Sequence, residues 1–134
     1  MTKIKNQNND ERISQLLTMA WSTSSPAREL AIANQILELD PDNIEALIIK
    51  ADQIEENQSL RLEILQHALK ALDKPGNCDP EEKILLFISI NHRIAYVFMA
   101  LGELDKAFEH CETVIKFCEE NSEDEYIKSE YDDT

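Results

Sequence analysis

Three histidines and three cysteines are the residues of this 134-residue chain best suited to metal binding or nucleophilic catalysis. A metal site needs several such side chains that converge on one point, and a nucleophile needs a base beside it. The sequence contains no HExxH, CxxC, glycine-rich phosphate loop or nucleophile elbow. His67, His92 and His110 also fall on different predicted helices. We therefore predict no catalytic centre.

The adjacent pair His110-Cys111 is the arrangement closest to a fragment of a metal site. Neighbouring residues on a helix point about 100° apart, so the two side chains cannot easily face one ion. Cys111 and Cys118 share a helix face, but the rise of about 10 Å between them is too long for a disulfide. We expect buried structural thiols, no enzyme, no metal and no cofactor. The odd number of cysteines favours a reducing, cytoplasmic location.

Charge restricts the class of partner. The chain has 27 acidic and 13 basic residues, a net charge of −14. A field of this sign repels phosphate backbones and anionic lipids, so we expect neither nucleic-acid nor membrane binding. The start MTKIKNQNNDER lacks the apolar core of a secretory signal, and no run of 18 uncharged apolar residues is present to span a bilayer.

Helical periodicity extends over most of the chain, which has only two glycines and four prolines. Asp42, with Glu45 three residues later, has the spacing of a capping box, and Ser59 is a candidate cap further on. Asp79 precedes a proline and two acids, a strong signal for a helix start, and Gly102 is a stop signal. The predicted helices cover residues 10–22, 26–39, 43–57, 59–72, 80–101 and 104–120.

The helices recur in pairs. Pro41 and Pro75 both follow a leucine-rich helix end, and they lie 34 residues apart. The third pair of helices has a large-small pair, an aromatic, a turn glycine and a small crossing residue: Ile94-Ala95, Phe98, Gly102 and Ala107. Together with LELDPDN at residues 37–43, this pattern resembles the tetratricopeptide repeat, a helix-turn-helix unit of 34 residues.

The resemblance implies an all-α fold, a right-handed α-α superhelix or solenoid of three hairpins. A domain over residues 1–121 would contain repeats at about 10–43, 44–77 and 80–121. Hairpins of this kind stack because one hairpin cannot bury its apolar face alone. Residues 122–134 are expected to be either an acidic tail or a short capping helix that begins at Ser122.

The family binds proteins, and the resemblance implies that role. The first helices of successive units line a concave groove, and the register places these residues in it: Ile48, Ile49, Asp52, His92, Arg93, Tyr96 and Met99. One subclass of the family binds a C-terminal carboxylate with Lys and Asn, but only Arg93 fits that pattern here. We expect an adaptor or scaffold that binds a partner peptide or helix, chiefly through Ile49, Arg93 and Tyr96.

Two alternatives stay open at this point. An acidic protein of three repeats also resembles secretion chaperones built from the same repeat, so an exported substrate is a candidate partner. The other alternative is a self-associating structural module. The predicted helix from Ile84 to Leu101 is apolar nearly all round. It either packs on several sides or presents a stripe through Leu86, Ile90 and Val97 to a partner helix or a homodimer.

Overall fold

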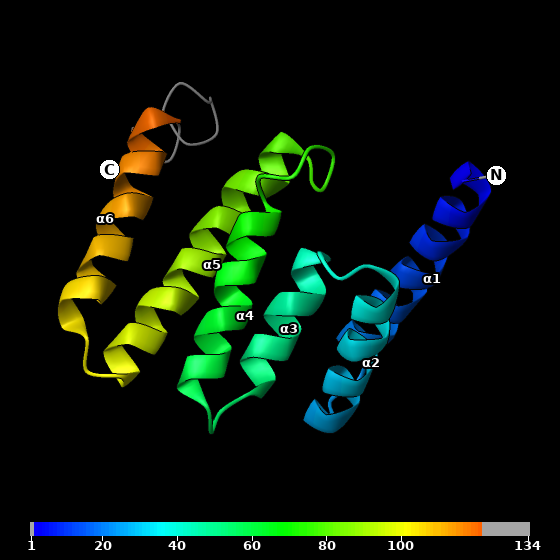
Figure 1. Cartoon of the computed structure of the whole chain (residues 1–134), viewed down its shortest axis with the longest axis horizontal. Helices are drawn as coiled ribbons and strands as arrows, with labels where there is room; N and C mark the ends of the chain where they lie inside the picture. Colours follow the sequence, from blue (N-terminus) through cyan, green and yellow to red (C-terminus); the bar gives the residue numbers. More distant parts are fainter. Residues whose placement is uncertain (1, 122–134) are drawn as a thin grey trace.

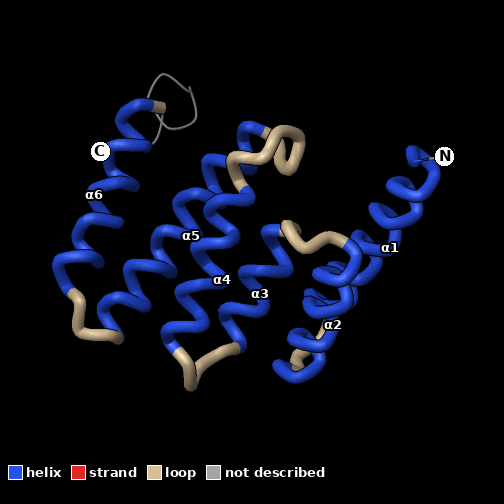
Figure 2. Tube along the Cα trace, in the orientation of Figure 1, coloured by secondary structure: helices blue, strands red, loops and turns tan. Residues whose placement is uncertain are grey.

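The computed structural model describes residues 2–121, and these residues form six α-helices and no strand (Figures 1 and 2). The helices are α1 (Thr2–Ser22), α2 (Pro26–Leu39), α3 (Ile44–Gln53), α4 (Gln58–Ala71), α5 (Pro80–Ala100) and α6 (Leu104–Glu120). The all-α prediction is confirmed. The acidic tail or capping helix predicted for residues 122–134 lies outside the described residues.

Some helix boundaries differ from the predicted ones. The first helix begins at Thr2 rather than near residue 10, because the polar stretch before Ile13 lacks apolar periodicity but also lacks a helix breaker. The third helix ends at Gln53, about one turn earlier than predicted. Asn57, not Ser59, caps α4, since its Oδ1 accepts a hydrogen bond from the backbone N–H of Leu60 at 3.0 Å.

The start of α3 also differs from the prediction. Asn43 is the N-cap, and its Oδ1 accepts a hydrogen bond from the backbone N–H of Ala46 at 2.9 Å. Asp42 therefore lies one residue before the cap, and its carboxylate is left to bind other groups. At the next junction, Asp79 occupies the N-cap position of α5 as predicted, but its side chain makes no capping hydrogen bond.

The hydrophobic core has two parts that meet at α3. The smaller part joins α1 and α2, where Leu16 and Ile36 are buried, to Ala46 of α3. The larger part joins Leu47 and Ala51 of α3 to side chains from α4, α5 and α6. Each helix contacts the next one along the chain, and Figure 1 shows the α3–α4 and α5–α6 pairs as hairpins. Because α3 contributes to both parts, it joins the N-terminal hairpin to the rest of the molecule.

The central helix of the larger core is α5, which contacts α4 and α6. Among the described residues it is the one helix whose length and apolar composition would suffice to cross a membrane. In this structure Ile90 and Val97 are fully or almost fully buried and Leu86 packs against the same core. The stripe through these three residues therefore packs within the chain, whereas Leu85, Tyr96 and Met99 of the same helix are exposed.

The α5–α6 hairpin is held by a buried polar contact and by aromatic packing. Asn91 is buried, and its Nδ2 donates to the backbone carbonyl of Phe87 at 2.9 Å. Its Oδ1 is left to accept a hydrogen bond from Nδ1 of His110 at 2.8 Å. Phe87 also stacks on Phe117, with ring centroids 4.1 Å apart. The contact needs a proton on Nδ1 of His110, and burial lowers the pKa of this ring, which disfavours its charged form.

The turn between α5 and α6 follows the predicted pattern. Gly102 has a φ of 78°, in the left-handed region that glycine adopts without strain. Ala107, on the first turns of α6, is buried in the larger core. A small residue at this position lets the two helices approach closely.

Candidate functional site

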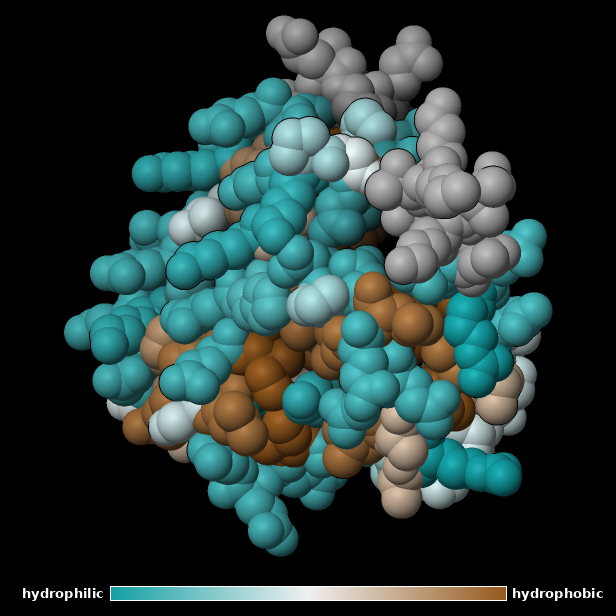
Figure 3. All heavy atoms as spheres, turned by 45° about the vertical axis from the view of Figure 1, so that its right-hand side comes forward, coloured by the Kyte–Doolittle hydropathy of each residue, from teal (hydrophilic) through white to brown (hydrophobic). Residues whose placement is uncertain are grey.

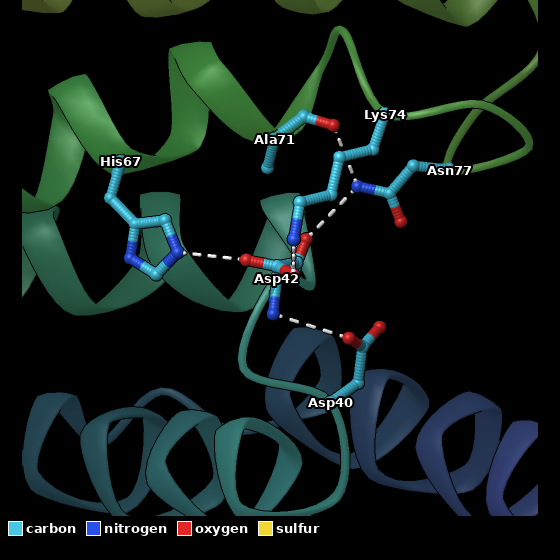
Figure 4. A network of polar contacts seen from close by, with 6 residues as sticks. All are labelled: Asp40, Asp42, His67, Ala71, Lys74 and Asn77. Atoms are coloured by element: carbon cyan, nitrogen blue, oxygen red, sulfur yellow. Dashed lines mark hydrogen bonds and ion pairs between the residues drawn. The ribbon is translucent and has the colours of Figure 1, made fainter.

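The two loops that connect successive hairpins lie against one another, as Figure 4 shows. Asp42, in the loop after α2, accepts hydrogen bonds from Nε2 of His67 at 2.9 Å and from Nζ of Lys74, in the loop after α4. Nδ2 of Asn77 donates to the backbone carbonyls of Asp42 at 3.1 Å and Ala71 at 2.9 Å. The bond from Lys74, and then that from His67, lowers the pKa of Asp42. The polar groups at this junction bind each other, so its role is structural.

The predicted groove residues of α3 lie mainly in the walls of the core. Ile48 is half-buried and packs against the larger part of the core. Ile49 is also half-buried and packs against the smaller part. Much of each side chain therefore packs between helices, and neither side chain is fully available to a partner.

Asp52 and Arg93, both predicted to face a partner, bind each other. Nε of Arg93 lies 2.9 Å from Oδ1 of Asp52, and Nη2 lies 3.0 Å from Oδ2. A further nitrogen of Arg93 donates to the side chain of Ser89, one turn earlier on α5. The guanidinium is therefore largely occupied within the chain. This differs from the predicted pairing of Arg93 with a partner carboxylate, because α3 and α5 bring an internal carboxylate within reach.

A hollow of about 240 Å³ opens where α4 and α5 meet, and it is lined by Arg61, His92, Arg93 and Tyr96. Arg61 comes from α4, while the other three residues come from α5. His92 and Tyr96 are exposed. Met99, the remaining predicted groove residue on α5, is also exposed but does not line the hollow. The structure thus brings three of the predicted residues together with one that the sequence did not single out.

The hollow is locally cationic on a protein of net charge −14. Of its two guanidinium groups, that of Arg93 is paired with Asp52. No carboxylate within the described part of the chain pairs with Arg61. A guanidinium forms strong charge-assisted hydrogen bonds with carboxylates, and a tyrosine ring offers flat apolar area with a polar tip. This arrangement can hold a carboxylate beside an apolar group.

The cysteines do not form a second site. Cys111 is exposed, and Cys78 and Cys118 are half-buried, so the expectation of buried thiols is wrong for Cys111. Burial, with the negative charge of Glu82, raises the pKa of the Cys78 thiol and makes it less nucleophilic. Over residues 2–121, no group of three His, Cys, Asp or Glu side chains is arranged to hold a metal ion.

Apolar side chains reach the surface of this acidic protein. Figure 3 shows hydrophobic residues gathered across one face, with hydrophilic residues around them. The large exposed apolar and aromatic residues of the last two helices are Leu85, Tyr96 and Met99 on α5 and Leu104, Phe108 and Ile115 on α6. Apolar contact area is therefore available next to charged groups.

Comparisons with protein-family models, with characterised proteins and with solved structures give no match to this chain. No family identity follows from them.

Proposed function

We propose that this chain is a tetratricopeptide-like interaction module whose three hairpins stack into a right-handed superhelix. Its function is to bind a segment of a partner protein. The contact between the two loops after α2 and α4 supports the repeat, since each loop contains a proline, Pro41 and Pro75, and the two lie 34 residues apart. The glycine turn at Gly102 and the buried Ala107 support it locally.

The hollow beside α5 is the observation that carries the binding role. It offers the guanidinium of Arg61, which pairs with no carboxylate of residues 2–121, and the exposed phenol of Tyr96. Arg and Tyr are among the residues enriched in binding hot spots. The side chain of Arg93 lines the hollow in a fixed conformation, because Asp52 binds its guanidinium through two hydrogen bonds. A side chain that is already ordered loses less conformational entropy on binding.

The chemistry of the hollow indicates the kind of segment that it binds. Arg61 would bind an Asp or Glu side chain, or a C-terminal carboxylate, and Tyr96 would cover a neighbouring apolar side chain. This role involves recognition and no catalytic step. A chaperone for an exported substrate would bind its client through the same hollow, so that alternative is one form of the proposal.

The test is a solution screen of peptides with free C-termini, followed by affinity measurements on variants of the full chain. Arg61→Ala combined with Tyr96→Ala should weaken the selected peptides about tenfold or more, which is the loss typical of truncated hot-spot residues. The matched control is Arg28→Ala combined with Trp21→Ala, since both are exposed and neither lines the hollow. The control should change affinity less than about twofold.

Two results would overturn the proposal. One is undiminished binding by the Arg61 and Tyr96 variant while its circular dichroism spectrum stays helical. The other is an equal loss in the control variant, which would place binding outside the hollow. The carboxylate preference would be refuted if the selected peptides contained no acidic residue and also bound without a free C-terminal carboxylate.

A further inference from the structure

The outer face of α6 carries an apolar stripe that no other described helix covers. Leu104, Phe108 and Ile115 are 61%, 70% and 54% exposed, and Cys111 between them is exposed too. With the half-buried Cys118, these residues are spaced by four, three, four and three positions. That is the spacing of a helix seam that packs against another helix.

The stripe has the length of a helix–helix contact. From Leu104 to Cys118 it rises about 21 Å, or nearly four turns. Another side of α6 already packs against α5, through Ala107 in the core, His110 on Asn91 and Phe117 on Phe87. Exposed apolar residues scattered singly need no explanation, but a contiguous row on a soluble protein marks an interaction surface.

A row of acids runs along one edge of the stripe. Asp105, Glu112 and Glu119 follow one another at intervals of seven residues, and all three are exposed. None of them forms an ion pair with a basic residue in the described part of the chain. The other edge, at Ala107 and Val114, turns towards α5. The stripe therefore has one edge against protein and one anionic edge.

We propose that this stripe docks an amphipathic helix of a partner protein that carries a row of Lys or Arg beside its apolar face. The apolar face of that helix packs on Phe108 and Ile115. Its basic row lies along Asp105, Glu112 and Glu119. In coiled coils, charged residues that flank the apolar seam select the partner in this way. The surface is distinct from the hollow and selects a partner of opposite charge.

Charge argues against a second copy of the chain as the occupant. Two copies bring together two molecules of net charge −14. A two-fold interface uses the same patch on both molecules, so an antiparallel pairing of α6 sets the acidic row against its own copy. Like charges facing across a helix pair are destabilising, and the repulsion selects against this pairing.

The same reasoning disfavours residues 122–134 of the chain itself. That segment contains six acidic residues and one lysine. Laid along the stripe, it would add negative charge next to Asp105, Glu112 and Glu119. A basic helix from another protein relieves the repulsion that the chain's own residues would increase.

The probes are three synthetic helical peptides of about 18 residues, long enough to span the stripe. The first has Leu along one face with Lys beside it, and the second has Glu in place of each Lys. The third has the composition of the first in an order that removes the apolar face. By fluorescence anisotropy at low ionic strength, we expect the first peptide to bind about tenfold or more tightly than either of the others.

Two variants of the full chain test the assignment of the surface. Glu112→Lys combined with Glu119→Lys should reverse the preference, so that the Glu peptide binds more tightly than the Lys peptide. Phe108→Asp combined with Ile115→Asp should weaken the Lys peptide about tenfold or more. The second variant is diagnostic because its added negative charge would strengthen non-specific attraction to a basic peptide. Weaker binding would therefore report the loss of apolar contact.

A matched control is Met19→Asp combined with Trp21→Asp, which makes the same kind of change at exposed apolar residues of α1. It should leave the preference unaltered. Bound peptide should also slow the alkylation of exposed Cys111 more than that of Cys78, which lies in the loop between α4 and α5.

Three outcomes would overturn the proposal. Equal binding of the Lys peptide and its reordered form would show attraction to charge alone. A dimer in sedimentation velocity that Phe108→Asp converts to a monomer would assign the stripe to a second copy. The third is slow alkylation of Cys111 in the free monomer that becomes fast when Tyr126→Ser and Ile127→Ser change two apolar residues of the segment 122–134. That result would assign the stripe to the chain's own residues.

Discussion

The hollow beside α5 and the stripe on α6 both expose an aromatic side chain, but they differ in electrostatics. Tyr96 stands with Arg61, whose guanidinium has no acidic partner among residues 2–121. Phe108 stands beside an acidic row that has no basic partner there either. The net charge of −14 therefore predicts the environment of the stripe but not that of the hollow.

This difference has a consequence for specificity. A segment that carries a carboxylate is attracted to the hollow and repelled by the stripe, and a basic helix behaves in the opposite way. Two surfaces on one small molecule can in this way select different partners.

The largest effect is expected at Phe98, in the core of α5, when it is compared with Phe108 on the stripe. Phe98 is 6% exposed and Phe108 is 70% exposed. Phe98→Ala should lower the free energy of unfolding by about 3–5 kcal/mol. Phe108→Ala should change it by less than about 0.5 kcal/mol. Urea denaturation measures both, and a large loss at Phe108 would mean that the stripe is covered in solution.

A smaller effect is expected at the crossing of α5 and α6. Ala107→Leu should destabilise the fold by about 1–3 kcal/mol, because it overpacks a buried position between close helices. Ala100→Leu, at an exposed position at the end of α5, is the matched control and should be nearly neutral. An unchanged urea midpoint for Ala107→Leu would mean that α5 and α6 do not approach closely at this residue.

The inner face of α6 should make stability depend on pH through His110. Burial lowers the pKa of this ring in the folded chain below its ordinary value of 6.5. The unfolded chain then takes up the proton more readily, so the free energy of unfolding falls as the pH drops below that value. Denaturation curves across this range should show the loss, and His110→Gln should remove it. A dependence that persists in the variant would assign it to other groups.

The smallest effect is expected at Asp42, which lies away from both surfaces. The bonds from Lys74 and His67 hold its pKa below the ordinary value of 3.8. Its contribution to stability is therefore present above that pH and is lost as the pH falls through the lowered pKa. Asp42→Asn should be less stable than the parent near neutrality, and the difference should vanish in strong acid. The preference of the hollow for acidic peptides and that of the stripe for the Lys peptide should not change. A change in either would link the loop junction to binding.

The helices could be predicted from the sequence because apolar periodicity and caps are local signals. The turn at Gly102 and the small residue at Ala107 followed from the same local pattern. The sequence does not single out the cap of α3, because Asp42 and Asn43 are both good capping residues and only tertiary contacts with the loop after α4 distinguish them.

The candidate sites depend on contacts that are distant in sequence. Asp52 and Arg93 were each predicted to face a partner, but their pairing requires the distance between α3 and α5. The sequence does not single out Arg61, because this residue lies on the second helix of a hairpin, which the repeat register does not place in the groove. On α6, apolar residues occupy both the inner and the outer face, so periodicity alone does not identify the exposed one.

The most direct test of this account is a two-dimensional amide NMR spectrum recorded with each class of peptide in turn. A peptide that ends in an acidic residue beside an apolar one should shift the signals of Arg61, His92 and Tyr96. The basic amphipathic peptide should instead shift those of Phe108, Glu112 and Ile115. Shifts confined to the same residues for both peptides, or absent for both at saturating concentration, would contradict the existence of two surfaces with opposite charge preference.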